Sequence, residues 1–303
     1  MAYLHENREE FTNAVNLASE YFHILPMVAE KDYYVTMILR GLSARLPFVV
    51  FKGGTSLSKC HKAIKRFSED IDITIDARLS QGQMKKLKET IKEIADELGL
   101  VIPNIDDTRS RRSYNRYVLE YKSVIGVTDD AIPSSVLMET SFAEVSFPTV
   151  MLPVHSYIGD MMQTEAPEER EHFLLEPFEM KVQGVDRTLV DKVFAICDYY
   201  LNDNIKKHSR HIYDIYKLFP LVPRDETFKK LVQEVREVRA QTNICPSAQP
   251  GINVPELLHL LIDNQVYRED YNLITERILE ETIPYDTAIE AVKMIAESGM
   301  FET

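Results

Sequence analysis

The chain has 303 residues, enough for one large domain or two ordinary ones, and its apolar fraction of 45% and charged fraction of 27% are those of a folded protein. Its net charge of −13 means that any nucleic-acid partner needs a local basic patch. The lack of an apolar run near ~18 residues argues against a membrane span, and three scattered cysteines argue against a disulfide framework and favour a cytoplasmic protein.

The first elements are predicted to be two helices followed by a short strand. Apolar residues recur every three or four positions over residues 5–29 and 29–45, which is the pattern of helices with one buried face. Pro47 ends the second helix, and the apolar run Phe48–Phe51 predicts a strand.

The stretch Phe48–Asp76 is predicted to form a strand, a glycine turn, a basic helix and a second strand. The turn Gly53-Gly54-Thr55-Ser56 would present backbone N–H groups at a helix start, which is a cradle for phosphate. Asp70 and Asp72 lie two positions apart, so both carboxylates leave one face of the second strand. Mg²⁺ relieves the repulsion between close carboxylates and also binds phosphate oxygens. The stretch therefore predicts nucleotide chemistry.

Simpler interpretations exist for parts of this stretch. A glycine pair alone can be a tight bend, and an acidic strand can be a solvated edge, although the isoleucines between and after the two aspartates favour a packed strand. The basic side chains of the helix form either a solvated face or a patch for phosphate groups. These side chains are Lys59, His61, Lys62, Lys65 and Arg66. Ser68 is either a turn residue or a hydroxyl near the nucleotide.

A helix and a polar loop follow the Asp72 strand. Ser80 is expected to cap a helix that runs to about Leu98 and stops at Gly99. The loop over residues 103–112 is rich in arginine, and it contains Arg109, Arg111 and Arg112.

Two further strands are predicted over residues 114–122 and 135–142, with a loop over 124–134 between them. Glu139 shares a face with Leu137 and Ser141 on the second of these strands, so it is a third candidate acid on a half-buried strand. Residues 148–177 predict loops and short pieces.

The pattern becomes helical near residue 178, which predicts a first domain over 1–178 and a helical second domain over 179–303. Helices are expected over 186–202, 209–219, 225–240, 255–281 and 285–299, with a mobile surface loop over 241–254.

Two polar side chains lie at the edges of apolar helix faces. Lys192 borders the apolar arc of the 186–202 helix, where it either extends its amine to solvent or faces a phosphate group. Asp214 lies beside Ile212 and Ile215 rather than opposite them. Arg210 is one turn away, so a surface ion pair is the alternative interpretation of Asp214.

Motifs between residues 29 and 219 resemble those of the AbiEii/AbiGii toxin family, within the polymerase beta-like nucleotidyltransferase superfamily. The matching motifs are Glu30-Lys31-Asp32-Tyr33-Tyr34-Val35-Thr36, Phe51-Lys52-Gly53-Gly54-Thr55-Ser56-Leu57, Arg66-Phe67-Ser68-Glu69-Asp70-Ile71-Asp72, Glu139-Thr140-Ser141, Leu189-Val190-Asp191-Lys192 and Arg210-His211-Ile212-Tyr213-Asp214-Ile215. Thr55 stands where the wider superfamily has a serine, and the longer gap to the aspartates is usual for the toxin branch.

The resemblance implies an α+β fold: a mixed-sheet nucleotidyltransferase core with flanking helices, followed by a helical C-terminal domain that closes the active-site cleft. It implies Mg²⁺-dependent transfer of a nucleoside monophosphate from an NTP. Asp70, Asp72 and Glu139 would bind the metal, Lys192 would stabilise developing charge, and Asp214 would orient the nucleotide or the acceptor. The triphosphate would be held by Lys52, Gly53, Gly54, Thr55, Ser56, Arg66 and Ser68.

The resemblance further implies that the acceptor is the 3′ end of tRNA and that an antitoxin is encoded beside the toxin, in a toxin–antitoxin or phage-defence system. Two other functions remain open at this point. One is transfer to a small molecule or a protein hydroxyl, which the negative net charge favours, and the other is a nucleotide-binding module without catalysis.

Overall fold

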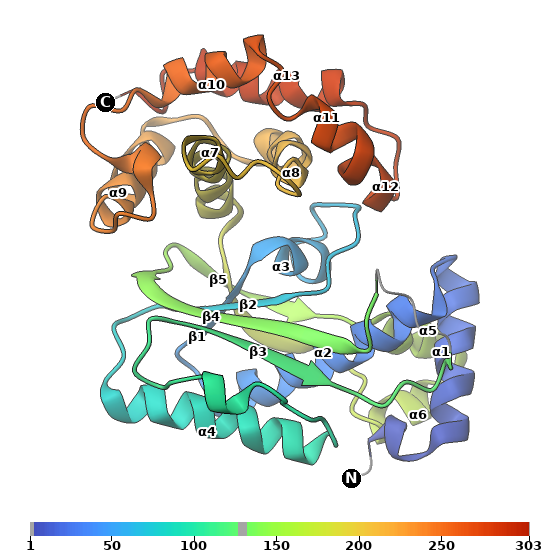
Figure 1. Ribbon diagram of the computed structural model, residues 1–303. Coiled ribbons are helices and arrows are strands. Elements are labelled where there is room, and N and C mark those ends of the chain that lie inside the picture. Colours follow the sequence, from blue (N-terminus) through green and yellow to red (C-terminus); the bar gives the residue numbers. More distant parts are fainter. Residues whose placement is uncertain (1–2, 127–131, 303) are drawn as a thin grey trace. The chain divides into compact units, whose positions relative to one another are not determined.

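The computed structural model describes residues 3–126 and 132–302, and the chain forms two compact units (Figure 1). The first unit, here called the sheet unit, comprises Met1–Cys60 and Glu69–Val182. The second, the helical unit, comprises His61–Ser68 and Gln183–Thr303. The short segment 61–68, which the sequence assigns to the first domain, therefore groups with the second unit.

The sheet unit is built on one mixed six-stranded sheet, as expected for an α+β fold. Its order is β3-β4-β2-β1-β6-β5, where β1 pairs antiparallel with β2 and parallel with β6, while β4 pairs parallel with β2 and antiparallel with β3. The strands are β1 (Val49–Lys52), β2 (Ile71–Ile75), β3 (Tyr114–Glu120), β4 (Ser135–Val145), β5 (Thr149–Val154) and β6 (Phe178–Gln183).

Helices cover both faces of this sheet. The long helices α2 (Pro26–Arg45) and α4 (Gln81–Glu97) lie on one face, and the short helix α3 (Gly53–Lys59) lies on the other (Figure 1). Helix α1 (Arg8–Phe22) packs against α2. The predicted cap of α4 is confirmed, because Ser80 accepts a hydrogen bond from the Gln83 backbone in a capping box.

Side chains alternate along β4, so every second residue faces α2. Val136, Met138 and Thr140 are buried, whereas Leu137 and Glu139 are half-buried and leave the other face. The predicted face of Glu139 is thus confirmed. Residues 127–131 of the predicted loop 124–134 lie outside the described residues.

The prediction of loops and short pieces over 148–177 is confirmed for the short elements, but it does not identify them as strands or helices. This stretch contains β5, helix α5 (Tyr157–Glu165) and helix α6 (Pro167–His172), and β6 follows where a helical domain is expected. These elements are six to nine residues long, too short for a clear periodic signal. Part of β5 is exposed to solvent, which weakens its apolar pattern further.

The helical unit consists mainly of five helices, as expected in number and approximate position: α7 (Val185–Leu201), α8 (Arg210–Leu218), α9 (Glu226–Arg239), α10 (Val254–Asp263) and α13 (Tyr285–Ala296). The predicted 255–281 helix is broken after α10 into α11 (Arg268–Asp270), a π-helical turn over Tyr271–Thr275 and α12 (Glu276–Ile278). In the part of the chain that the structure describes, none of the helices has the length and apolar character that crossing a membrane requires.

Segment 61–68 is held in the helical unit by backbone pairing. The Phe67 N–H donates to the Ile278 carbonyl at 2.9 Å, and the Glu280 N–H donates to the Lys65 carbonyl at 3.0 Å. The Tyr213 hydroxyl accepts a hydrogen bond from the Lys65 N–H at 2.9 Å. The predicted basic helix up to Arg66 is therefore wrong, because α3 ends at Lys59 and the chain then pairs in an extended conformation.

Candidate active site

A row of charged side chains crosses four strands on the α3 face of the sheet. The pairing registers place Lys52 opposite Asp72, Asp72 opposite Glu139, and Glu139 opposite Arg116. Residues in register on neighbouring strands point to the same face, so two carboxylates stand between two cations. We call these four side chains the charged row.

The turn between β1 and α3 lies directly against the charged row. Gly53 has a φ of +80°, and a Cβ atom there would lie 1.9 Å from the Asp72 Oδ2 atom. Only glycine tolerates both this backbone conformation and this close approach. The Asp72 carboxylate therefore lies at the first turn of α3.

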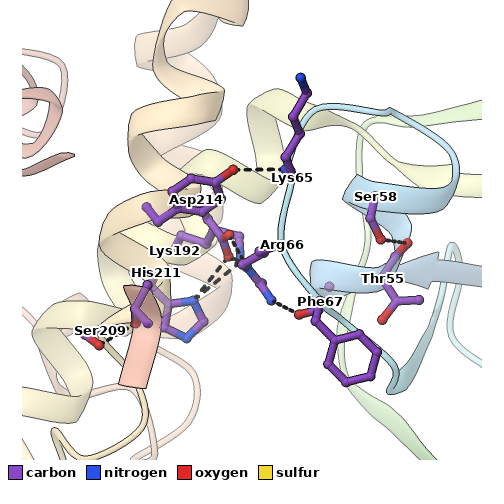
Figure 2. Close-up of polar contacts among 12 residues, drawn as sticks. Thr55, Ser58, Lys65, Arg66, Phe67, Lys192, Ser209, His211 and Asp214 are labelled. Atoms are coloured by element: carbon purple, nitrogen blue, oxygen red, sulfur yellow. Dashed lines mark hydrogen bonds and ion pairs between the residues drawn. The ribbon is translucent and has the colours of Figure 1, made fainter. Parts of the chain in front are cut away.

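The hydroxyl groups of the turn are used in different ways. Ser56 donates to the Gly53 carbonyl at 2.9 Å, and Ser58 donates to the Thr55 carbonyl at 3.1 Å (Figure 2). Thr55 and Ser56 are buried, whereas Gly53 and Gly54 are half-buried. The backbone of the glycine pair is thus the more accessible part of this turn.

Tyr114 completes the surroundings of Glu139. Its hydroxyl donates to Glu139 Oε1 at 2.8 Å, and Arg116 Nε lies 3.9 Å from the same oxygen. Burial and the neighbouring Glu139 carboxylate raise the pKa of Tyr114 to about 12. Tyr114 therefore remains a hydrogen-bond donor to Glu139 at neutral pH.

The donor set fits a metal that takes few protein ligands. Asp72 and Glu139 are neighbours in register, whereas Asp70 lies just before β2. Among residues 3–126 and 132–302, no three acidic, histidine or cysteine side chains converge closely enough to hold a metal ion by themselves. Two carboxylates suffice for Mg²⁺ when substrate phosphates supply the other oxygens, so the pair matches a metal that arrives with a nucleotide.

Segments around α2 support this region, and the sequence motif Glu30-Lys31-Asp32 provides the contacts. Lys31 is buried and pairs with Glu69 at 2.5 Å, next to Asp70. Asp32 pairs with Lys59 at the end of α3 and accepts a hydrogen bond from the Tyr157 N–H at 2.9 Å. Glu30 accepts hydrogen bonds from Ser123 and Val124, both at 2.7 Å. Sequence reasoning used this motif for the resemblance but missed its supporting role.

A second polar cluster lies inside the helical unit (Figure 2). Asp214 is fully buried, and both of its oxygens are occupied by Arg66, with Nε to Oδ1 at 2.7 Å and Nη2 to Oδ2 at 2.9 Å. Lys192 Nζ lies 2.6 Å from Oδ2. The alternative prediction, a surface ion pair of Asp214 with Arg210, is therefore wrong. The partners of Asp214 are buried, and one of them is distant in sequence. We call Arg66, Lys192 and Asp214 the buried triad.

Electrostatics in the buried triad follow from one carboxylate facing two cations. Burial alone would raise the pKa of Asp214, but Arg66 and Lys192 outweigh it and hold that pKa well below its usual range. Burial lowers the pKa of Lys192, and the Arg66 charge lowers it further. His211 Nδ1 lies 3.4 Å from Lys192 Nζ. Burial and the Lys192 charge hold the pKa of His211 well below 6.5, so the ring is neutral.

The remaining predicted site residues are placed as follows. His61, expected on a basic helix, contacts the Gln183 carbonyl at 2.9 Å instead. Ser68 is half-buried in segment 61–68, and Lys65 is exposed. The structure thus brings the predicted residues together as two sets, the charged row with Gly53 in the sheet unit and the buried triad in the helical unit. Arg116 and Tyr114 join the charged row without having been singled out from the sequence, whereas His211 belongs to the motif that also contains Asp214.

Comparisons with known proteins concern the chain as a whole. A family model described as nucleotidyl transferase AbiEii toxin, type IV TA system, matches residues 38–291. No curated protein is similar enough to this chain to count as a match. Among solved structures, the chain is similar to MenT4, a nucleotidyltransferase toxin from Mycobacterium tuberculosis H37Rv, with 14% sequence identity and a TM-score of 0.48. That similarity covers 95% of this chain and 88% of the other.

Proposed function

Because the chain belongs to the AbiEii family of nucleotidyltransferase toxins of type IV toxin–antitoxin systems, we propose that it transfers a nucleoside monophosphate from an NTP to a hydroxyl group, with Mg²⁺ held by Asp72 and Glu139. The observation that carries this proposal is the charged row. Its two carboxylates are neighbours in register and lie against the glycine turn. Asp70 is the predicted further ligand.

Mg²⁺ at this site would bind phosphate oxygens and lower the pKa of the attacking hydroxyl. The residues of the chain have complementary tasks. Lys52 and Arg116 flank the two carboxylates and supply positive charge for the triphosphate. The Gly53 and Gly54 N–H groups would bind phosphate oxygens without a side chain in the way. The acceptor oxygen bonds to the α-phosphorus, and pyrophosphate leaves.

We propose distinct roles within the buried triad. Lys192 and Arg66 are the cations that would stabilise charge on the polyphosphate. Asp214 has both oxygens occupied, so it is a positioning residue that holds these two cations rather than a group that touches the nucleotide. This role differs from the direct orientation of nucleotide or acceptor that the resemblance implies for Asp214.

For the acceptor we propose the 3′ end of tRNA, with a cognate antitoxin as the protein partner. The family membership supports an antitoxin. The net charge of −13 favours a small-molecule or protein hydroxyl instead, so both kinds of acceptor belong in the test.

Incubation with Mg²⁺, each α-labelled NTP in turn, and total tRNA tests the proposal. We expect label in tRNA with wild-type protein, and a loss of at least about 10³-fold in Asp72→Asn, since removing a metal ligand forfeits roughly 4 kcal/mol of transition-state stabilisation. Asp263→Asn on α10 is the matched control, because this carboxylate is exposed. Label on the protein or on a small molecule would identify that molecule, rather than tRNA, as the acceptor. No label on any acceptor, including the protein itself, would end the proposal.

A further inference from the structure

The loop before β3 concentrates positive charge in an acidic protein. Residues 109–116 contain four arginines, Arg109, Arg111, Arg112 and Arg116, and no acidic residue lies between Thr108 and Leu119. All four arginines are exposed. Because the net charge of the chain is −13, such a stretch is a local exception to the electrostatics of the whole surface.

The backbone of this loop is fixed by its own contacts. The Asn115 side chain accepts from the Arg109 N–H at 2.8 Å and donates to the Arg109 carbonyl at 2.9 Å. Arg112 donates from its backbone to the Arg109 carbonyl at 3.0 Å and from its guanidinium to the Asp107 carbonyl at 3.1 Å. Within residues 3–126 and 132–302, no hydrogen bond or ion pair involves the Arg111 side chain. A rigid turn therefore presents at least one unpaired guanidinium to solvent.

An exposed aromatic ring stands among these arginines. Tyr114 is 49% exposed, although its hydroxyl is bound to Glu139. Arg116 follows two residues later on the same strand, so its side chain leaves the same face as Tyr114. Exposed aromatic rings interleaved with cations are the elements with which proteins bind unpaired bases and the phosphates between them.

We propose that Arg111, Arg112 and Tyr114 form a docking surface for a single-stranded RNA end, next to Arg116 of the charged row. A base would stack on the Tyr114 ring, and the guanidinium groups would bind the neighbouring phosphates. Since the Tyr114 hydroxyl is anchored on Glu139, a strand bound there ends beside the charged row. The inference rests on the proposed function in one respect: it assigns this surface to the acceptor of that reaction.

An unpaired strand fits the surface better than a duplex or an acidic protein segment. A duplex keeps its bases stacked and leaves the ring unused. An acidic peptide would satisfy the arginines, but it carries no base to stack on Tyr114. The expectation is therefore tighter binding of single-stranded RNA than of the same sequence in a duplex.

Fluorescence anisotropy with a labelled RNA strand of about 12 nucleotides, without NTP or metal, tests the surface in the full chain. Arg111→Ala/Arg112→Ala is expected to weaken binding at least ~10-fold. The slope of log affinity against log salt should become shallower by about 1.4, because each lost phosphate contact on a single strand contributes about 0.7. Arg111→Glu alone should also weaken binding, and it spares the Arg112 contact with the loop backbone.

Matched variants distinguish RNA binding at this surface from a general electrostatic effect of the net protein charge. Lys229→Ala/Lys293→Ala removes the same charge from exposed positions on α9 and α13 and should change affinity less than ~2-fold. Tyr114→Phe keeps the ring and should bind RNA as wild type does, whereas Tyr114→Leu should bind ~10-fold more weakly.

Wild-type affinity and salt slope in the arginine variants would overturn the inference. So would an equal loss in the lysine control, or equal affinity for duplex and single strand. Binding of labelled poly-glutamate without any binding of RNA would assign the surface to an acidic protein partner instead. The transfer assay with all acceptors is scored separately, so a protein that binds RNA through Arg111 but transfers no label refutes the proposed function rather than the docking surface.

Discussion

Asp72 in the sheet unit and Asp214 in the helical unit both belong to sequence motifs shared with the toxin family. They differ in burial and in the charge of their neighbours. Asp72 is half-buried on a sheet face beside a second carboxylate, with one cation on each side of the pair. Asp214 is fully buried, and its oxygens contact two cations directly. The first arrangement sets two carboxylates side by side on a partly accessible sheet face, whereas the second encloses one buried carboxylate between two cations.

This difference separates two kinds of functional residue. Like charges in register destabilise the empty site, and a bound metal relieves that cost, so Asp72 is suited to binding. A buried pair stabilises little in total but leaves a large penalty when one partner is removed, so Asp214 is suited to holding other groups in place. The following predictions test whether the two acids divide in this way.

The largest expected effect is on stability at Asp214. Asp214→Ala leaves Arg66 and Lys192 buried without their carboxylate and should cost about 3–5 kcal/mol of unfolding free energy. Asp72→Ala, the matched change in the sheet unit, should cost less than about 1 kcal/mol. Urea titration followed by circular dichroism measures both values. Equal costs would mean that the two acids do not differ in structural role.

A second measurement keeps this prediction meaningful if Asp214→Ala fails to fold. Replacing the whole buried triad by apolar residues, as Arg66→Met/Lys192→Met/Asp214→Leu, removes every buried charge at once and should recover most of the lost stability. Nucleotide transfer should remain absent in this variant, because both cations are gone.

Gly53→Ala is expected to have the next largest effect. The new Cβ would overlap the Asp72 carboxylate, and the positive φ adds strain, so we expect a cost of about 2–3 kcal/mol and a ~10²-fold loss of transfer. Gly251→Ala is the control, since its φ is +84° and no atom lies within 4 Å of the added Cβ. It should show only the strain, about 1 kcal/mol, with full activity. Thermal unfolding measures the stability cost, and the transfer assay measures the activity. Equal values for Gly53→Ala and Gly251→Ala would contradict the close contact between position 53 and Asp72.

The smallest expected effect is the pH dependence from His211. Its pKa lies well below 6.5 in the fold because of burial and the Lys192 charge, so below pH 6.5 the unfolded chain binds a proton that the folded chain does not. Stability contributed by the neutral ring is therefore present above pH 6.5 and is lost as the pH falls. Between pH 6.5 and 5.5 the wild type should lose about 1 kcal/mol more than His211→Gln.

The Asp214 carboxyl does not interfere in this window. Its pKa is lowered in the fold, so its contribution is present above the unfolded value of 3.8 and disappears only at lower pH. Parallel stability curves for wild type and His211→Gln between pH 6.5 and 5.5 would contradict the neutral, buried state of this ring.

The sequence predicts the faces of the sheet better than it predicts the partners. Alternation places Glu139 on the half-buried face of β4, and this is confirmed. The strand register is not predictable in the same way. Asp72 lies opposite Glu139 because β2 pairs in parallel with β4, and no pattern within either strand sequence indicates this pairing. Arg116 could be found only once that register was known.

The helical unit shows the same limit more strongly. Apolar spacing identifies Lys192 and Asp214 as polar groups at apolar faces, but their burial depends on Arg66, which lies 148 positions from Asp214. The run from Lys59 to Arg66 has helix-forming side chains, and yet pairing with residues 278–280 makes its last part extended. Tertiary pairing overrides local propensity here, as it often does for short segments.

The assignment of segment 61–68 to the helical unit has a consequence for inheritance. The chain passes between the two units after Cys60, after Ser68 and after Val182, so neither unit is encoded by one uninterrupted stretch. A single recombination point can therefore not exchange the helical half for that of another gene without also separating Arg66 from Asp214. Such chains are expected to diversify by substitution within both halves together rather than by shuffling of modules.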